Sequence, residues 1–452
     1  MVCEWRTATV LELQTEGILL VEDGNHGEYR PRPDEFVDDG VVFIRAADMD
    51  GGRVLFGSAS RINETARGRI TKGVGAGGDV LLSHKGTVGK VALVPNDSPP
   101  FVCSPQTTFW RTLMPEVLDR QYLHAFLRSP GFHRQLRSRS GETDMAPYVS
   151  LTAQRGLTVT VPPIEIQRFI AGAIGSLDDK IELNRRMNET QETIARALFK
   201  SWFIDFDPVR AKMAGRAPAG LDPATAALFP SRLSNSLLGE VPVGWSATTL
   251  VQVTSKIGSG ATPRGGDRAY VPQGTAFIRS QNVYDSEFVW EGLVFISDAD
   301  AEHLRGVTVQ PDDVLLNITG ASILRTCVVE QSVLPARVNQ HVAIVRAKPE
   351  VPARYLHFHL LRPQTKAYLL GFDAGASRQA VTKSHIESVP LVLPTVQVLQ
   401  RFNETCLPLF SMVSNNREQA RTLATLRDML LPKLLSGELR IRDADRKVGN
   451  VA

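Results

Sequence analysis

The chain has 452 residues, of which 43% are hydrophobic and 22% charged, with a formal net charge of +3. One ordinary core does not fill this length, so two to three domains are expected. No segment approaches the roughly 18 consecutive apolar residues of a membrane span, and the N-terminus lacks the basic start and apolar core of a secretory signal. We therefore expect a cytoplasmic protein that spans no membrane.

The cysteines at 3, 103, 327 and 406 lie far apart without a C-x-x-C pair, which argues against a zinc site and a disulfide framework. Charge is unevenly distributed: residues 1–50 hold four Arg/Lys against twelve Asp/Glu, and residues 51–160 hold fourteen against seven. Basic runs at 61–72 and 128–139 dominate the second stretch. Such clusters attract phosphate backbones, although a solvated helix or loop face explains them equally well.

Residues 1–162 form the first predicted β-rich part. Short apolar runs such as "VVFIRAA", "GKVALV" and "TTFWRTL" alternate there with Gly, Pro and Asp/Asn, a pattern typical of short strands and turns. A long helix is predicted over 163–206, where a spacing of alternating four and three residues marks a coiled-coil stripe. This first stripe consists of Ile170, Ile174, Leu177, Ile181, Asn184, Asn188, Gln191, Ala195, Leu198 and Trp202.

The second half of the chain has the same order. An Ala/Pro/Gly-rich linker is predicted at 207–240, a second β-rich part at 241–393, a second long helix at 394–437 and a tail at 438–452. Pro408 cannot donate a helical hydrogen bond, so a kink or a late helix start is expected there. The second stripe consists of Phe402, Cys406, Leu409, Val413, Asn416, Ala420, Leu423, Arg427, Leu430 and Leu434.

The two halves are copies of one unit. "FIRAADMDGGRV" begins at Phe43 and "FIRSQNVYDSEFV" at Phe277, an offset of 234 that "DVLLSHKG" and "DVLLNITG" share, as do Gln106 and Gln340. "QRF" recurs at an offset of 233, and "EWRTATVLEL" resembles "GWSATTLVQV". Matches in a common order indicate an internal duplication.

The two long helices are expected to pack on each other. About 35 to 40 residues at 1.5 Å rise span roughly 50–60 Å, which is longer than one such domain needs to cover its core, although packing on its own core is the commoner fate of an amphipathic helix. Asn184 and Asn416 at the seam would fix the register. The sequence therefore predicts an α+β fold: two β-rich domains in a tandem pseudo-two-fold repeat, separated by two antiparallel helices that form a coiled-coil spacer.

A search for a catalytic centre finds none. The chain has no G-x-x-x-x-G-K-[ST], H-E-x-x-H or G-x-S-x-G motif and no G-x-G-x-x-G opening a helix. "DPVR" at Asp207 lacks the second proline and the aromatic residue of an adenine methyltransferase motif. "PDDVLL" is better explained as a strand-opening turn than as a nuclease carboxylate pair, and the histidines, including "HFH", lack metal-site spacing. No catalytic or metal-binding residue is predicted.

Several segments in a common order resemble one family. "GEVPVGWSATTL", "IGSGATPRGGDRAYV" and "GDVLLSHKGTVGKVALV", together with the helical "VPPIEIQRFIAGAIGSLDDKIELNRRMNETQETIARALFKSWFIDFDPV" and "LRDMLLPKLLSGELRI", are similar to the specificity subunit of type I restriction-modification enzymes. The likeness covers nearly the whole chain. The first unit has "TEGILLVEDGNHGE" where the second has its "GSGATP" segment.

This resemblance implies a non-catalytic DNA-recognition subunit. Each β-rich part would be a target recognition domain for one half of an asymmetric bipartite site in double-stranded DNA, and the helices would set the gap and dock two modification (methyltransferase) subunits. Restriction (translocase/endonuclease) subunits would join through these. S-adenosylmethionine, Mg and ATP are expected in the partner subunits, with no cofactor on this chain.

Candidate DNA contacts are basic and amide side chains in the loops, because Arg pairs bidentately with guanine and Asn or Gln with adenine. The candidates are Arg45, Arg67, Arg69, Lys72, Lys85 and Lys90 in the first unit and Arg264, Arg268, Arg279, Gln281, Asn282 and Arg325 in the second. Gln106 and Gln340 also match, but buried amides that hold a turn would explain them equally well. For partner docking, the exposed faces of the helices are candidates, with "KSWF" and "PKLL" at their ends. The alternative for Trp202 and Phe203 is a place in the core at the helix end.

Two other classes stay open on the sequence alone. One is a stand-alone DNA-modifying enzyme whose motifs are degenerate. The other is a binding module for protein or carbohydrate, because β-rich repeats joined by helices present suitable surfaces. Activity of the purified chain without added subunits would favour the first class, and salt-dependent DNA affinity would argue against the second.

Overall fold

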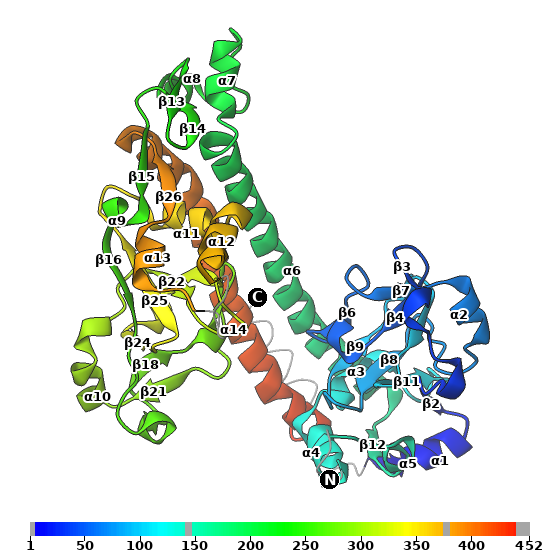
Figure 1. Ribbon diagram of the computed structural model, residues 1–452. Coiled ribbons are helices and arrows are strands. Elements are labelled where there is room, and N and C mark those ends of the chain that lie inside the picture. Colours follow the sequence, from blue (N-terminus) through cyan, green and yellow to red (C-terminus); the bar gives the residue numbers. More distant parts are fainter. Residues whose placement is uncertain (1–4, 141–146, 374–379, 440–452) are drawn as a thin grey trace. The chain divides into compact units, whose positions relative to one another are not determined.

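The computed structural model describes residues 5–140, 147–373 and 380–439, so Cys3 and the predicted tail from residue 440 lie outside the described residues. The chain forms two compact units (Figure 1). Unit 1 comprises residues 1–185 with 418–452, and unit 2 comprises residues 186–417. The boundary falls within both long helices, α6 (Ile164–Phe203) and α14 (Val396–Leu435). Each unit therefore contains one part of each helix.

In unit 1, β1 pairs with β12, the order β2-β11-β8-β9-β6-β5 makes a six-stranded sheet, and the order β10-β4-β7-β3 makes a four-stranded one. The strands are β1 (Arg6–Thr9), β2 (Leu19–Asp23), β3 (Phe36–Val37), β4 (Val41–Ile44), β5 (Met49–Asp50), β6 (Arg53–Val54), β7 (Ser60–Ile62), β8 (Val80–Ser83), β9 (Val91–Leu93), β10 (Phe101–Cys103), β11 (Thr107–Thr112) and β12 (Thr158–Val161). The short helices are α1 (Val10–Thr15), α2 (Glu64–Arg69), α3 (Arg120–Leu127), α4 (Pro130–Arg139) and α5 (Leu151–Arg155).

In unit 2, β15 pairs with β26, and the orders β16-β25-β22-β23 and β17-β21-β18-β24 make two four-stranded sheets. The strands are β15 (Ser246–Thr249), β16 (Thr254–Ser259), β17 (Tyr270–Val271), β18 (Thr275–Ile278), β19 (Val283–Tyr284), β20 (Glu287–Phe288), β21 (Val294–Ile296), β22 (Val314–Asn317), β23 (Thr326–Val328), β24 (Ala336–Val338), β25 (Val342–Ala347) and β26 (Pro390–Leu393). The helices are α9 (Leu250–Val253), α10 (Asp298–His303), α11 (Ala353–Leu361), α12 (Pro363–Leu370) and α13 (Lys383–Glu387).

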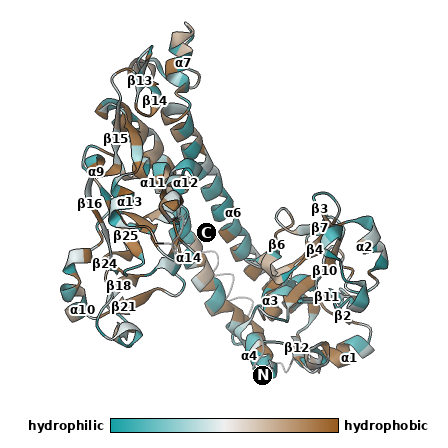
Figure 2. Ribbon diagram, viewed as in Figure 1, coloured by the Kyte–Doolittle hydropathy of each residue, from teal (hydrophilic) through white to brown (hydrophobic). Residues whose placement is uncertain are grey.

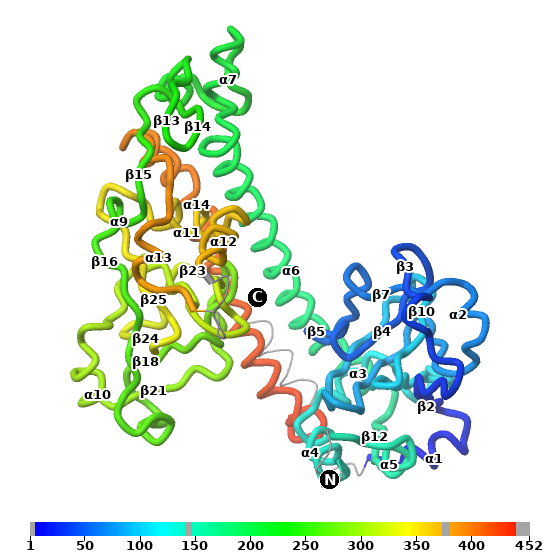
Figure 3. Tube along the Cα trace, in the orientation of Figure 1, coloured from blue at the N-terminus to red at the C-terminus, as the bar shows by residue number. Residues whose placement is uncertain are grey.

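The strand orders confirm the duplication. β2-β11-β8-β9 of unit 1 corresponds to β16-β25-β22-β23 of unit 2, and β10-β4-β7-β3 corresponds to β24-β18-β21-β17. The pair β10–β4 in unit 1 and the pair β24–β18 in unit 2 are both parallel. The other pairs of these matched sheets are antiparallel in both units. Figure 3 traces the Cα path of the chain through both copies.

Unit 2 also contains a segment without a counterpart in unit 1. The passage predicted as a linker folds into α7 (Asp207–Met213), α8 (Pro223–Ala227) and a hairpin of β13 (Leu233–Ser236) and β14 (Gly239–Pro242). Val209 and Phe229 are buried, and the Phe229 ring lies 5.1 Å from the ring of Trp202 at the end of α6. The aromatic helix end therefore continues into an apolar cluster.

Each long helix begins in one core and ends in the other. In unit 1 the core contains Ile170, Ile174 and Leu177 of α6 with Leu423, Leu430, Leu431 and Leu434 of α14. In unit 2 it contains Ala195, Phe199, Trp202 and Phe203 of α6 with Val398, Leu399, Phe402, Cys406 and Phe410 of α14. Both helices accordingly carry hydrophobic and hydrophilic residues along their length (Figure 2). Trp202, Phe203 and Leu434 are buried, so the apolar side chains of "KSWF" and "PKLL" belong to the cores, which is the alternative to docking.

The helices pack antiparallel through a polar middle, as predicted. Asn184 Nδ2 donates to Gln419 Oε1 at 2.8 Å, and Asn416 Nδ2 donates to Asn188 Oδ1 at 2.9 Å. The partner number on α14 falls as the number on α6 rises, which is the antiparallel sense. α14 begins at Val396, ahead of Pro408, so the alternative of a late start is wrong. Burial of Phe402, Cys406 and Phe410 on both sides of the proline keeps this stretch helical.

A buried ion pair recurs at the same place in both sheets. Asp79 precedes β8 and accepts from Arg111 Nε and Nη2 at 2.7 and 2.8 Å. Asp313 precedes β22 and accepts from Arg346 Nε and Nη2 at the same two distances. Both carboxylates also accept a backbone N–H at 2.7 Å, from Ala76 and Gln310 respectively. The "PDDVLL" aspartate is thus a strand-opening residue, as the repeat indicated.

We predict that Asp313→Ala lowers the free energy of unfolding of unit 2 by about 3 kcal/mol, because it leaves Arg346 without its buried partner. Hydrogen exchange should accelerate in β22 and β25 and stay unchanged in β8 and β11, and Asp79→Ala should give the reverse pattern. Glu302→Ala is the control, since its carboxylate is 71% exposed and an exposed pair contributes less than about 1 kcal/mol. Equal protection in wild type and Asp313→Ala would contradict the prediction.

Candidate nucleic-acid interface

Four loops meet at one end of each unit. In unit 2 the turn between β24 and β25 is bonded to the end of β18, because Asn339 N donates to Ile278 O at 3.0 Å, and to the end of β22, because Ile318 N donates to His341 O at 3.0 Å. The loop after β16 joins them through Gly260 N, which donates to Val342 O at 2.9 Å. We call residues 260–262, 278–279, 318–319 and 338–341 the tip of unit 2.

The tip of unit 1 comprises residues 24–26, 44–45, 84–85 and 104–107, with the same bonds. Ser104 N donates to Ile44 O at 2.8 Å, and His84 N donates to Gln106 O at 2.8 Å. Gly24 N donates to Thr107 O at 3.2 Å. A Cβ on Gly24 would overlap the carbonyl oxygens of Cys103 and Ser104, just as one on Gly260 would overlap those of Val338 and Asn339. Within "TEGILLVEDGNHGE", the part "EDGNHGE" therefore takes the place of "GSGATP", and the structure adds that Gly24 corresponds to Gly260.

Gln106 and Gln340 are both exposed in the turn of their tip. The alternative of buried, turn-holding amides is therefore wrong, because the backbone bonds of the neighbouring strand ends already fix each turn. The repeat does not match them residue for residue, because the bonds from His84 N and Ile318 N place Gln106 opposite His341. The Thr262 hydroxyl donates to Gln340 Oε1, and Gln340 Nε2 lies 3.2 Å from His341 Nε2. The His341 Nδ1 is in turn 2.7 Å from the Thr319 hydroxyl. The polar side chains of this tip thus form a connected chain, in which Thr262 and Gln340 are exposed and His341 and Thr319 are half-buried.

Two of the six basic candidates of unit 1 lie at its tip. Arg45 follows the end of β4, with its side chain 44% exposed and its Nε 3.3 Å from Asp48 Oδ2. Lys85 follows His84 and is exposed, with its Nζ 5.8 Å from the ring centre of Tyr148. Lys72 is exposed, and its backbone contacts the His26 ring of the tip.

The other three basic candidates of unit 1 are bound within the unit. Arg67 Nη1 donates to Ile70 O at 3.1 Å, and Lys90 Nζ donates to Met49 O at 2.9 Å. Arg69 donates to Glu35 at 2.6 Å and, with the Arg32 backbone N–H, lowers the pKa of that carboxyl to about 2. These contacts stabilise local turns and leave these three side chains less available to a ligand.

In unit 2, Arg264 and Arg268 are exposed in the loop that begins at Gly260. Arg279 follows β18 at the tip, and its Nη2 donates to Gly292 O at 2.6 Å while its guanidinium lies 5.4 Å from the ring centre of Tyr270. Gln281 is exposed and donates to the same carbonyl at 3.2 Å. Arg325 lies apart from these, 4.2 Å from the ring centre of Tyr284.

Asn282 is excluded as a contact residue. Its side chain is fully buried, its Oδ1 accepts from Arg279 N at 3.0 Å, and its Nδ2 donates to Val289 O at 2.9 Å. Asp48 holds the matching turn of unit 1, where its carboxylate accepts from Arg45 N at 2.8 Å. The repeat could have shown this, because an Asp and an Asn at matching places share only the ability to accept a backbone N–H.

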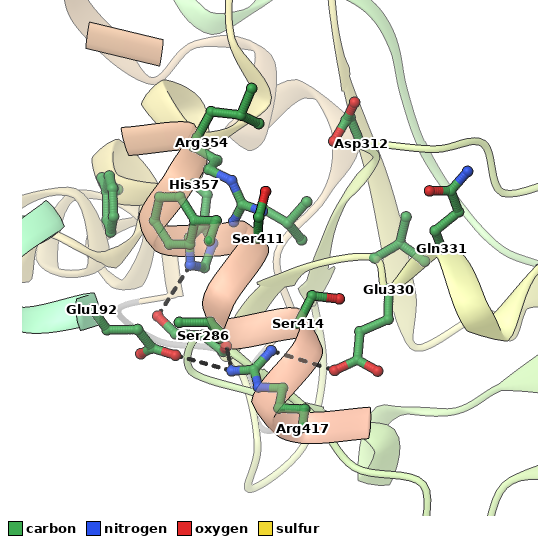
Figure 4. Close-up of a pocket in the computed structure, with 16 residues that line it drawn as sticks. Glu192, Ser286, Asp312, Glu330, Gln331, Arg354, His357, Ser411, Ser414 and Arg417 are labelled. Atoms are coloured by element: carbon green, nitrogen blue, oxygen red, sulfur yellow. Dashed lines mark hydrogen bonds and ion pairs between the residues drawn. The ribbon is translucent and has the colours of Figure 1, made fainter. Parts of the chain in front are cut away.

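A pocket of about 190 Å³ in unit 2 is lined by several charged residues, of which Arg417, Glu192 and Glu330 form ion pairs (Figure 4). Arg417 donates to Glu192 at 2.9 Å and lies 3.3 Å from Glu330, while the Ser286 hydroxyl lies 3.1 Å from His357 Nε2. Burial raises the pKa of Glu192. These contacts fasten the turn between β19 and β20 to the long helices, which is a structural role.

Among the residues that the structure describes, no group of three His, Cys, Asp or Glu is placed to hold a metal ion. No helix in this same part of the chain is long and apolar enough to cross a membrane. The site with exposed, matched polar groups in both copies is the tip.

The comparisons with known proteins point to one family. The chain is 26% identical over 445 residues to the type I restriction enzyme HindI specificity subunit of Haemophilus influenzae, covering 88% of this chain and 94% of that protein. It is 25% identical over 371 residues to the MjaIX specificity subunit of Methanocaldococcus jannaschii, covering 81% and 78%. The fold matches the S subunit of a type I restriction-modification system from M. genitalium with a TM-score of 0.52, at 13% identity and covering 95% and 96%. No family model matches.

We predict acid sensitivity from a second matched pair, His124 and His357, which burial keeps neutral with a pKa of about 3. The unfolded chain takes up these protons near pH 6.5. Stability therefore falls as the pH drops from about 6.5 toward 3, by about 1 kcal/mol per histidine at pH 5.5. His357→Gln should flatten this slope in unit 2 and leave unit 1 unchanged, as measured by hydrogen exchange against pH. His303→Gln, on the exposed end of α10, is the control, and an unchanged slope in His357→Gln would contradict the prediction.

Proposed function

Because this chain is related over most of its length to type I restriction enzyme specificity subunits, we propose that it is the DNA sequence-recognition subunit of such a complex. Each β-rich part would be a target recognition domain that contacts one half of a bipartite site in double-stranded DNA. The observation that carries this proposal is the tip, which is built twice from the same backbone bonds and presents exposed polar side chains both times.

The two half-sites should differ, because the two tips share a framework but not its side chains. Gln106 stands beside Lys85 and Tyr148 in unit 1, whereas Gln340 stands beside Thr262, His341 and Thr319 in unit 2. Different donors and acceptors select different base edges in the major groove. Because the tips of the two units carry different side chains, the DNA target of one chain should be asymmetric.

The long helices would set the gap between the half-sites and dock the modification subunits. Forty residues in each helix make a rod of about 60 Å, and the seam amides fix its register. Met187 and Ile194 of α6 lie one turn on either side of Gln191, whose Nε2 is 3.6 Å from Met412 Sδ. Met187 is 39%, Ile194 46% and Met412 43% exposed. Exposed apolar side chains that lie together suit a protein partner.

Methyl transfer and cleavage would belong to partner subunits. The described residues contain no metal-ligand cluster, and in the pocket of unit 2 Arg417 is held by ion pairs with Glu192 and Glu330. S-adenosylmethionine, Mg and ATP would then be bound by modification and restriction subunits, and this chain would bring the target adenine to them.

Methylation mapping at single-base resolution tests the proposed function. We expect cells that carry this chain with its modification subunit to show an asymmetric bipartite motif, with modified adenine in each half, that deletion of the chain abolishes. Exchange of residues 244–393 for those of a related chain should alter only one half. One junction lies between β14 and β15 and the other between β26 and α14. The exchange therefore leaves α6 and α14, which contribute to both cores, unchanged. An unaltered methylome after deletion would contradict the proposal.

Docking is tested on helix α6. Met187→Glu with Ile194→Glu should weaken capture of the modification subunit at least tenfold, because two carboxylates would enter an apolar contact, and should leave the melting temperature unchanged. Thr193→Ala, exposed on another side of the same helix, is the control. Equal capture by the double variant and the control would exclude this face.

A further inference from the structure

We propose that Gln106 and Gln340 are the base-reading amides of the two recognition domains, each selecting an adenine in one half-site, and that their neighbours make the two half-sites differ. This inference rests on the proposed DNA-recognition function and names the residues that would carry out the recognition. It assigns a role to two residues outside the basic candidates.

The position of the two residues is the first argument. Each glutamine lies in a turn that hydrogen bonds from three other segments hold in place, namely Ile44, His84 and Gly24 in unit 1 and Ile278, Ile318 and Gly260 in unit 2. The glycine on the β2 or β16 loop is required, because a side chain there would overlap the turn. A rigid backbone thus presents a flexible amide in the turn of each tip, although Gln340 lies one position earlier in its turn than Gln106 does, and base readout needs such a fixed backbone.

The chemistry of the amide is the second argument. One carboxamide donates and accepts at once, which matches the N6 donor and N7 acceptor of adenine in the major groove. Gln106 and Gln340 are both exposed. Within the described residues the Gln106 amide has no hydrogen-bond partner, and the Gln340 amide bonds only to Thr262 and His341, both at the tip. Within the described residues neither amide bonds to a residue outside its own tip, so both can bind a ligand.

The charges around each amide are the third argument. Arg45 and Lys85 flank Gln106, and Arg279 flanks Gln340, each on a segment bonded to the turn. Arg45 and Lys85 are exposed, and Arg279 is half-buried. Cations beside a neutral amide provide phosphate attraction next to base readout, the division of labour found in protein–DNA interfaces. The neighbours also differ: Lys85 with Tyr148 offers a cation over an aromatic ring, whereas Thr319 with His341 offers a hydroxyl and an imidazole.

The test uses the full chain co-expressed with its modification subunit, with methylation mapped at single-base resolution. Gln340→Ala should relax one adenine position in one half-site, with discrimination there falling about tenfold to a hundredfold, and should leave the other half-site unchanged. Gln106→Ala should do the same in the other half. Gln340→Glu should shift that position from adenine toward cytosine, because a carboxylate can only accept and cytosine N4 donates. Gln273→Ala, exposed in the turn before β18, is the matched control.

The outcomes separate this inference from the proposed function. If wild type gives no bipartite motif, the proposed function fails and the inference with it. If wild type gives the motif and Gln106→Ala and Gln340→Ala both leave every position unchanged, the inference is overturned while the proposed function stands. A uniform loss across both half-sites in chains with wild-type melting temperature would also overturn it, because it would indicate a phosphate or structural role.

Discussion

The burial of both ends of each long helix in different cores is the constraint on which the structure depends. Leu430 and Leu434 of α14 complete a core made mostly by the first half of the chain, and Phe199 and Trp202 of α6 complete the core of the second. Neither unit has a closed apolar interior without a segment from the other end of the sequence. Apolar burial contributes roughly 25 cal/mol per Å², so neither helix can leave without exposing a core. Both long helices thus contribute to the core of each copy. The middle of each helix is not needed for these cores and can be polar.

That polar middle has a consequence for spacing. At the seam, Asn184 bonds to Gln419 and Asn188 to Asn416, where leucines would pack more stably but would tolerate a slip of one turn. A slip would leave these amides without partners, and an unpaired buried amide costs about 1 to 3 kcal/mol. The apolar ends thus provide stability and the amides provide register. On the proposed function, register matters most, because the gap between half-sites is a length measured along these helices.

Much of this architecture could be predicted from the sequence, because it depends on patterns that repeat. Matching strings at offsets of 233 and 234 predict the duplication, and the stripe from Ile170 to Trp202 predicts the helix that the structure shows. Local chemistry was harder to predict. Asn282 has a side chain of the type that reads bases, but it is a buried turn residue. Trp202 has a side chain of the type that docks partners, but it lies in the core. Sequence gives side-chain type, whereas burial depends on segments far away along the chain. The correspondence of Gly24 with Gly260 could not be predicted from the sequence. The two glycines are alike only in their close approach to the backbone of the neighbouring turn, which at Gly24 is that of Cys103 and Ser104.

Ion pairs within each unit also reduce the basic charge that is available to a phosphate backbone. Much of the basic charge is neutralised within each unit: Arg111 and Arg346 pair with buried aspartates, Arg128 and Arg427 share Asp178, and Arg417 lies between Glu192 and Glu330. Arg128 belongs to a run that its sequence would assign to phosphate binding. Each phosphate contact contributes through counterion release, so a chain that uses its arginines internally has few left for nonspecific attraction. On the proposed function, base contacts at the tips would then account for a larger share of binding to DNA.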